Sequence, residues 1–133
     1  MELADTRHCH CLAARMEARA ITRIFEARLR PHGLRATQFS VLAVLAQRGT
    51  IRLKELARIL DLERTTLTRI AGLLERRGLV ETTPSPDARE RPLAITLAGR
   101  RALADALPSW REAQEAVDRR LAASPRGRIT STP

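Results

Sequence analysis

The first apolar pattern in the chain has the spacing of a helix. Between positions 12 and 29 the apolar residues recur on one face, with arginines on the other side. They are Leu12, Met16, Ala20, Ile21, Ile24, Phe25 and Leu29. This spacing predicts an amphipathic helix that buries one face. Pro31 and Gly33 are expected to end it.

Three more helices are predicted before the next change of pattern. Thr37 is expected to cap a helix over 38–47, which is apolar on nearly every side and therefore buried. A short third helix follows from the spacing of Leu53, Leu56, Ala57 and Leu60. A tight connection at 61–63 leads to a fourth helix over about 64–77, ended by Gly78.

The sequence pattern changes after the fourth helix. Residues 79–84 and 91–95 are predicted to be strands around a turn at 85–89. Pro84 and Pro92 lack an N–H group, so both strands are expected at sheet edges. A two-stranded hairpin is marginally stable alone and must therefore pack on the helices.

A last helix is predicted to begin after Thr96, which would cap it. Six of its residues are spaced four, three, four, three and four apart, which is a heptad-like seam. The seam consists of Leu103, Leu107, Trp110, Gln114, Val117 and Leu121. Pro108 is expected to kink this helix. Residues 122–133 show no periodicity and are expected to be disordered.

The order of four helices, a hairpin and a helix is that of a winged helix-turn-helix. The fold class is therefore predicted to be mainly α with a small β-hairpin wing. A length of 133 residues corresponds to one domain. Aromatic residues make up 2% of the chain, so the core must be aliphatic, which favours packed helices.

The charge of the chain indicates a polyanionic partner. Lys and Arg number 24 against 15 Asp and Glu, which gives a net charge of +9. Nucleic acid is the usual partner of so basic a protein. Lys54 is the sole lysine, so a coding bias towards arginine is the alternative explanation.

Neither a membrane span nor an export signal is predicted. The longest apolar run, at 41–46, is far shorter than the ~20 residues of a membrane helix. The N-terminal residues are charged and lack the apolar centre of a signal peptide. The two cysteines are too close in sequence to staple a fold. A cytoplasmic location without a membrane partner is expected.

One face of the predicted fourth helix carries candidate DNA contacts. Its apolar residues cluster on one side, and the opposite side holds Thr65, Thr68, Arg69, Gly72 and Arg76. Arginine binds guanine edges or phosphates, threonine meets phosphate or a thymine methyl, and glycine lets the backbone approach. An ordinary polar surface is the alternative. The β-branched threonines, which an exposed helix disfavours, favour a groove-binding face.

The predicted turn between the strands carries a second set of charges. Asp87 and Arg89 are two positions apart, with Arg91 beyond them. An arginine at a wing tip can enter a minor groove, where the negative potential is deep. Asp87 would orient a neighbouring arginine through a charge-assisted hydrogen bond. An ordinary charged turn is the alternative, because Asp is common in turns.

Six short segments carry a resemblance to a known family. They are Thr37 to Leu42, Leu53 to Ala57, Leu67 to Arg69, Leu74 to Val80, Asp87 to Arg89 and Ile95 to Gly99. With them the chain, over about residues 12–121, resembles the MarR family. These are dimeric winged-helix regulators of transcription, often repressors released by small phenolic ligands or by oxidants.

The resemblance implies roles for the matching residues. Contacts to the groove or the phosphates would be made by Thr65, Thr66, Thr68 and Arg69. Arg89 would be the wing arginine. Thr37 and Gln38, at the start of the second helix, would lie near the DNA backbone.

The resemblance also implies a homodimer whose first and last helices interlock. Two-fold symmetry would place two recognition helices about one DNA turn apart, on a pseudo-palindromic operator in double-stranded DNA. Packing of the same apolar stripes within one chain is the alternative.

The chain is therefore expected to be one domain with parts of different roles. These parts are an N-terminal dimerisation helix at 8–31, a winged helix-turn-helix core at 36–99, a C-terminal dimerisation helix at 100–121 and a tail at 122–133. Pro125 and Gly127 end the helical pattern where family members continue into a further apolar helix. A weaker dimer, or a tail that is not ancestral, would account for this departure.

His8, Cys9, His10 and Cys11 form the chemically richest run of the chain, and three interpretations of it stay open. In the first, Cys9 or Cys11 is a redox switch or effector site, activated by nearby arginines and able to bridge across the dimer. In the second, the run binds a soft metal, although adjacent ligands are poorly spaced for one tetrahedral site. In the third, it simply starts the first helix, with its sulfurs packed as apolar groups.

No catalytic constellation stands out, and no cofactor is expected. His32 has no evident partner in the sequence, and there is no phosphate-binding glycine loop. We therefore expect a regulator of transcription and not an enzyme: a homodimeric, sequence-specific DNA-binding repressor relieved by a small ligand or by thiol oxidation. The alternative is a winged-helix protein-interaction module that does not bind DNA.

Overall fold

The computed structural model describes residues 2–87 and 90–123 of the chain. A short 3-10 helix, η1 (Ala4–His8), leads into the long helix α1 (His10–Leu29) and a second 3-10 turn, η2 (Arg30–His32). The middle of the chain forms α2 (Ala36–Arg48), β1 (Ile51–Arg52), α3 (Leu53–Leu60) and α4 (Arg64–Arg76). The wing strands β2 (Val80–Thr82) and β3 (Pro92–Ile95) precede the last helix, α5 (Leu97–Ala123).

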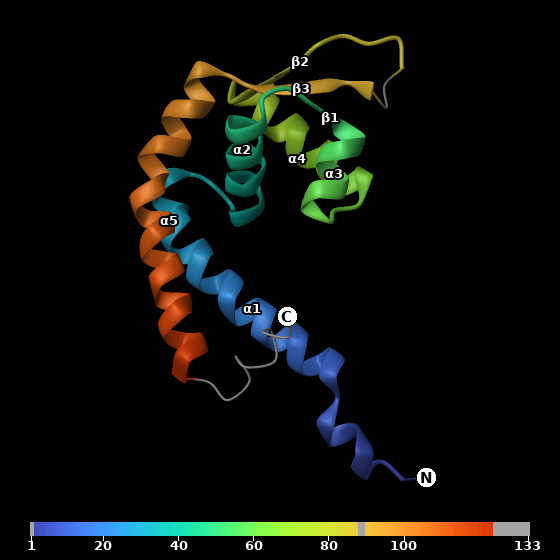
Figure 1. Ribbon diagram of the computed structural model, residues 1–133, viewed down its shortest axis with the longest axis vertical. Helices are drawn as coiled ribbons and strands as arrows, with labels where there is room; N and C mark the ends of the chain where they lie inside the picture. The colour runs from blue at the N-terminus through green and yellow to red at the C-terminus, as the bar shows by residue number, and fades with distance from the viewer. Residues whose placement is uncertain (1, 88–89, 124–133) are drawn as a thin grey trace.

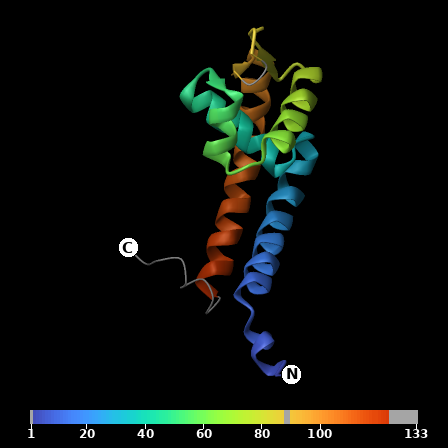
Figure 2. The same cartoon turned by 90° about the vertical axis from the view of Figure 1, so that its right-hand side faces the viewer.

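Two long helices form an arm, and the remaining elements form a lobe at one end of it. Helices α1 and α5 lie side by side in both views, with η1 extending beyond the described end of α5 (Figures 1 and 2). The lobe contains α2, α3, α4 and the small sheet, and α2 lies between α5 and the other two helices (Figure 1). The predicted mainly helical architecture is confirmed.

The core is aliphatic, as the composition requires. Its fully buried large side chains come from every main element except β1 and α5, and are Leu29, Leu34, Val41, Leu42, Leu45, Leu56, Leu67, Leu74, Val80 and Leu93. Helix α5 adds the buried Ala106 to the same cluster. No polar side chain of the described residues is buried. The fold is therefore held by burial of aliphatic surface, worth about 25 cal/mol per Å² removed from water.

The sheet has three strands, one more than the sequence predicted. Its order is β1-β3-β2, with antiparallel pairing of Ile51 with Leu93 and of Val80 with Ile95. Strand β1 is two residues long, which is too short to show an alternating pattern in the sequence. Its pairing makes β3 the central strand.

The expected edge position is therefore confirmed for the first wing strand, β2, and wrong for the second, β3. Pro92 opens the central strand β3, and Pro84 lies after the end of β2. Pro92 is tolerated because it is the first residue of its strand, where a missing N–H costs no ladder bond. Its carbonyl oxygen still accepts a hydrogen bond from the N–H of Thr83, with the two atoms 3.1 Å apart.

The start of α2 also differs from the prediction, because Arg35 and not Thr37 precedes the first turn. The side-chain oxygen of Gln38 accepts the Arg35 N–H at 3.0 Å, and a carboxylate oxygen of Glu26 accepts the Ala36 N–H at 2.7 Å. These two acceptors satisfy N-terminal amides that a helix cannot satisfy by itself. Thr37 is left exposed on the first turn.

The predicted cap of the last helix is confirmed. The hydroxyl oxygen of Thr96 accepts the Gly99 N–H at 3.0 Å, and the same hydroxyl donates to the carbonyl of Gly78 at 2.6 Å. Helix α5 then runs as one continuous element across Pro108 (Figure 1). Gly33 follows α1 and its 3-10 turn, and Gly78 follows α4. Their φ angles are 69° and 73°. Such positive φ values favour glycine.

Part of the seam on α5 packs within its own chain. The indole of Trp110 stacks on Phe39 of α2, with ring centroids 5.9 Å apart and planes 9° from parallel. Phe25 of α1 lies 6.5 Å from the same indole. His32, which has no evident partner in the sequence, makes a 2.8 Å hydrogen bond with Ser109 of α5. These contacts join α1, α2 and α5 where the arm meets the lobe.

Replacing Gly99 by alanine is expected to destabilise the fold. A Cβ at this position would lie 2.1 Å from the carbonyl oxygen of Leu79 and 2.7 Å from Cγ1 of Ile95, so α5 would have to move. We expect a loss of about 1–3 kcal/mol in the free energy of unfolding, measured by urea denaturation. Gly72→Ala is the matched control, because its Cβ would meet only the Arg76 side chain, at 3.5 Å. A loss in Gly99→Ala no larger than in that control would contradict the packing argument.

Candidate nucleic-acid interface

The two sides of α4 have opposite character. Its buried side chains are Leu67, Ile70, Ala71 and Leu74, as the sequence predicted. The opposite face exposes Thr65, Thr68, Arg69 and Arg76. Gly72 on this face and Thr66 beside it are half-buried. The burial of one side therefore fixes which side chains face outward.

Polar side chains line a hollow at the first turn of α4. The hollow has a volume of about 540 Å³ and is lined by Arg64, Thr65, Thr68 and Arg69. The Thr68 hydroxyl donates to the carbonyl of Arg64 at 2.7 Å, which leaves its oxygen lone pairs able to accept from a ligand. Two guanidinium groups and two hydroxyls are therefore gathered at this turn.

A second hollow joins α4 to the wing. This groove of about 400 Å³ is lined by Leu53, Arg64, Thr68, Ala71, Gly72, Glu75, Thr82 and Arg91. Thr68 and Arg91, predicted separately as groove and wing residues, thus share one surface. The hydroxyl of Thr82 donates to Glu75 at 2.9 Å, which ties β2 to α4. The Arg91 carbonyl accepts the Leu53 N–H at 3.2 Å, which ties the base of the wing to α3.

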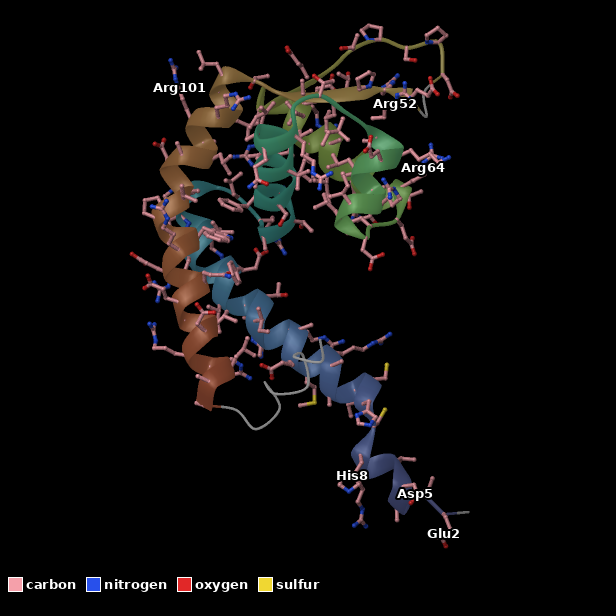
Figure 3. All side chains as sticks on the ribbon, in the orientation of Figure 1. Glu2, Asp5, His8, Arg52, Arg64 and Arg101 are labelled. Carbon is pink, nitrogen blue, oxygen red and sulfur yellow. The ribbon has the colours of Figure 1, made fainter. Side chains whose placement is uncertain are left out.

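Two arginines of this surface were missed by the sequence reasoning. Arg64 lines both hollows, and the exposed Arg52 pairs with Pro92 in the sheet. Both lie at the end of the lobe away from α5, whereas Arg101 lies on the opposite side (Figure 3). Position 64 could have been found, because first-turn residues of a recognition helix reach base edges. The position of Arg52 depends on a strand too short to recognise.

The remaining predicted DNA contacts are placed less closely together. Asp87 is exposed, and its carbonyl accepts the Glu90 N–H at 3.0 Å, while Arg89 lies outside the described residues. Thr37 and Gln38 lie on the first turn of α2 and line neither hollow. The amide oxygen of Gln38 is already used to cap that helix.

Cys9 and Cys11 lie at the start of α1, and both are exposed and free. Packing of their sulfurs as apolar groups is therefore wrong. Cys9 caps the helix, with its Sγ accepting the Leu12 N–H at 3.5 Å. Across the described residues, no group of three or more His, Cys, Asp or Glu side chains is arranged to hold a metal ion.

Exposed ion pairs join the helices of the arm. Arg28 pairs with Glu112 at 2.5 Å, and Arg120 pairs with Glu17 at 3.0 Å. The hydrogen bond to Glu17 raises the pKa of Arg120 above its ordinary value. In the described part of the chain, no helix has the length and apolar character needed to cross a bilayer.

Comparison with known proteins identifies the family. The family model described as MarR family matches residues 32–89. The MosR regulator of M. tuberculosis, solved in complex with DNA, is 39% identical over 92% of this chain and 90% of its own, with a TM-score of 0.79. The chain belongs to the MarR family. The resemblance inferred from the sequence is confirmed.

Two further relatives agree with this assignment. The repressor CouR, solved bound to a 23-mer DNA duplex, is 27% identical over 97% of this chain and 90% of its own, with a TM-score of 0.75. The uncharacterised helix-turn-helix regulator YwoH of Bacillus subtilis is 35% identical over 79 residues, which span 59% of this chain and 58% of YwoH. The protein is a MarR-type transcriptional regulator and not an enzyme, as its relatives are named regulators.

Proposed function

We propose that this protein is a sequence-specific repressor that binds double-stranded DNA in the cytoplasm. It acts as a homodimer on a pseudo-palindromic operator, with one α4 helix in the major groove of each half-site. A small ligand or thiol oxidation relieves repression.

The outward face of α4 is the observation that carries the proposal. Its exposed Thr65 and Arg69 lie opposite apolar side chains that are buried, so the helix is anchored while its polar face points outward. Arg64 and Arg91 extend the positive charge from α4 to the wing. A basic, hydroxyl-bearing helix beside a wing matches the needs of groove and phosphate recognition.

The relatives support a DNA partner. MosR and CouR were both solved with DNA, and each matches nine-tenths of its own length to this chain. The net charge of +9 favours the same partner. The alternative, a winged-helix module that binds proteins alone, leaves this charge without a role.

Loss of Arg69 or Arg89 is expected to weaken binding to the DNA upstream of the protein's own gene. Each Arg→Ala change should cost about 1–3 kcal/mol of binding free energy, measured by mobility shift. Arg101→Ala removes the same charge from the far side of the lobe and should leave affinity within about twofold of the wild type (Figure 3). Full affinity in both Arg69→Ala and Arg89→Ala would refute the contact assignment. Wild-type binding that does not weaken as salt rises would favour the protein-interaction alternative.

Exposed apolar side chains on α1 support the homodimer. Leu12 and Met16 lie one helical turn apart and are 55% and 54% exposed. Their own chain leaves this stripe uncovered, and a second copy of the arm would cover it. The packing of Trp110 and Ala106 within the chain shows that the same arm also has an intramolecular face.

Charged substitutions in this stripe are expected to dissociate the dimer. Leu12→Glu with Met16→Glu should shift the mass from two copies towards one in sedimentation equilibrium, because each carboxylate would be buried without a partner. Leu97→Glu is the control, since Leu97 is 65% exposed on the other helix of the arm. The dimer proposal fails if the wild type sediments as a monomer at micromolar concentration.

The position of Cys9 supports relief by oxidation. Its sulfur is exposed at the N-terminus of α1, where an oxidant in solution can reach it, and the thiolate is the form that oxidants attack. Hydrogen peroxide converts the thiolate to a sulfenic acid and releases hydroxide. A second thiol then condenses with the sulfenic acid to give a disulfide and water. Cys11 lies two residues away and is exposed as well.

Peroxide is expected to release the wild-type protein from its operator, and dithiothreitol is expected to restore binding. The single variants Cys9→Ser and Cys11→Ser should resist peroxide. With peroxide added, each should bind DNA within about threefold of its own untreated affinity, as measured by fluorescence anisotropy. Non-reducing gels distinguish a bond between subunits from one within a chain. Equal release of the wild type and both serine variants would exclude the thiol switch.

A small ligand is the second route to relief. A hollow of about 350 Å³ between α2 and α5 is within the size range of small-molecule sites. Its lining is mainly apolar and aromatic, with Phe39, Leu107 and Trp110 beside Arg100. Release by an aromatic acid that persists in the cysteine-free protein would assign relief to a ligand.

A further inference from the structure

We infer that Arg77 is a positioning residue for DNA recognition, which holds α4 at a fixed angle to the arm without touching DNA. The inference rests on the proposed function, because it concerns the helix proposed to enter the groove. It assigns Arg77 a role different from that of its neighbour Arg76, although the two side chains carry the same charge.

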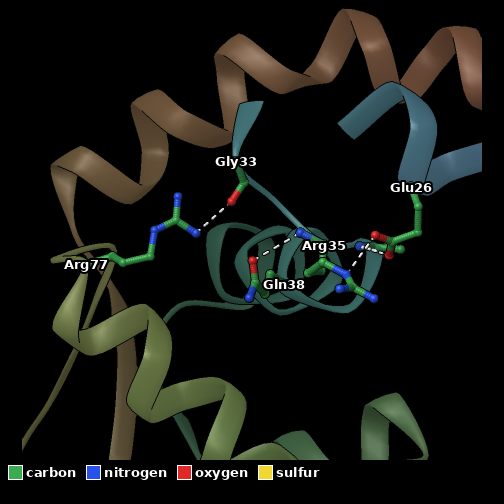
Figure 4. A network of polar contacts seen from close by, with 6 residues as sticks. Glu26, Gly33, Arg35, Gln38 and Arg77 are labelled. Carbon is green, nitrogen blue, oxygen red and sulfur yellow. Dashed lines mark hydrogen bonds and ion pairs between the residues drawn. The ribbon is translucent and has the colours of Figure 1, made fainter. Parts of the chain in front are cut away.

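The two arginines point to different places. Arg76 lies on the exposed face of α4, near Gly72. Arg77 ends the helix, and its guanidinium donates a hydrogen bond to the carbonyl of Gly33 at 2.7 Å. Gly33 belongs to the turn between α1 and α2, 44 residues earlier in the chain (Figure 4). One side chain therefore joins the end of the recognition helix to the end of the arm.

The turn leaves room for this guanidinium because residue 33 is glycine. A Cβ on Gly33 would lie 3.1 Å from Nη2 of Arg77, which is a tight contact. The φ angle of 69° at Gly33 also aims its carbonyl as a glycine permits and most residues do not. The contact thus depends on a conformation built into the turn.

The turn that receives Arg77 is itself held firmly. One carboxylate oxygen of Glu26 accepts the Ala36 N–H at 2.7 Å, and the other pairs with Nε of Arg35 at 2.8 Å. The Arg35 N–H donates to Gln38 at 3.0 Å (Figure 4). Polar contacts therefore run from α1 through the turn to α2, and Arg77 adds α4 to them.

Other contacts secure the same end of α4. Glu75 accepts from Thr82 of the wing, and the Gly78 carbonyl accepts from Thr96 beside α5. These bonds fix α4 to the wing and to α5. The Arg77 bond adds a tie to the end of α1 and so sets the angle between the recognition helix and α1. In a dimer joined through the arms, that angle sets the distance between the two recognition helices.

The experiment compares Arg76→Met with Arg77→Met in the full chain. Methionine keeps an unbranched side chain and removes the charge and the donors. Operator affinity is measured over a series of salt concentrations, since each lost phosphate contact lowers the salt slope by about 0.9. Arg76→Met should weaken binding and lower the slope. Arg77→Met should weaken binding about tenfold with the slope unchanged, and Arg77→Lys, which keeps a donor, should recover to within about threefold.

A second readout tests the angle directly. A second operator carries one extra base pair between its half-sites. The ratio of the affinity for the original operator to the affinity for this lengthened one should be the same for the wild type and for Arg76→Met. Arg77→Met should show a smaller ratio, because its recognition helices are less tightly fixed. A general loss of stability would not change this ratio. If circular dichroism shows that Arg77→Met is unfolded, Arg77→Gln takes its place. A glutamine side chain at position 77 is too short to reach Gly33.

The possible failures are distinct. Absence of operator binding by the wild type refutes the proposed function. Wild-type affinity in Arg77→Met, or a slope lowered as far as in Arg76→Met, overturns the positioning role while the proposed function stands. An unchanged spacing ratio overturns it as well.

Discussion

The burial of α2 is the constraint on which the rest of the structure depends. Val41, Leu42 and Leu45 are fully buried, and Phe39 of the same helix stacks on Trp110 of α5. Helix α2 therefore packs against the arm on one side and against α3 and α4 on the other (Figure 1). Because protein interiors are close-packed, a shift of this helix would move both parts.

This packing determines what the protein can present to a partner. Leu67 and Leu74 are both fully buried in the lobe, so α4 cannot rotate without exposing them. Its polar face is consequently fixed outward, beside the wing that carries Arg91. DNA recognition in this architecture requires that the side chains on the outer face of α4 are held in fixed positions. The buried aliphatic core holds them there. The Gly33–Arg77 contact adds a polar tie at the point where the lobe meets the arm.

Helical periodicity predicted α3 and α4 closely because their buried residues recur every three or four positions. Predictions from single residues failed where a contact from another part of the chain overrides the local preference. Thr37 is a good capping residue, yet α2 already begins at Ala36 because Glu26 from α1 satisfies the Ala36 amide. Pro92 signals a strand edge, yet β1 pairs beyond it.

The candidate DNA-binding surface shows the same division. Periodicity alone separates the polar and buried faces of α4, and it thus identifies Thr65, Thr68 and Arg69 as outward-facing residues. It does not show that Arg64 and Arg91 share a groove, since that depends on how the wing folds back over the helix. It places Arg76 on the outward face, but it does not show that the adjacent Arg77 reaches Gly33.

The sequence by itself determined the order of the five main helices and the two wing strands, the buried faces of α3 and α4, and the family, because these follow from spacing and from local motifs. The tertiary structure alone decided which residues far apart in sequence meet: Arg52 with Pro92, Glu26 with Ala36, and Arg77 with Gly33. The physical reason is that a hydrogen bond across 44 residues leaves no periodic signal in the sequence. It exists only once the aliphatic core has brought its two ends together.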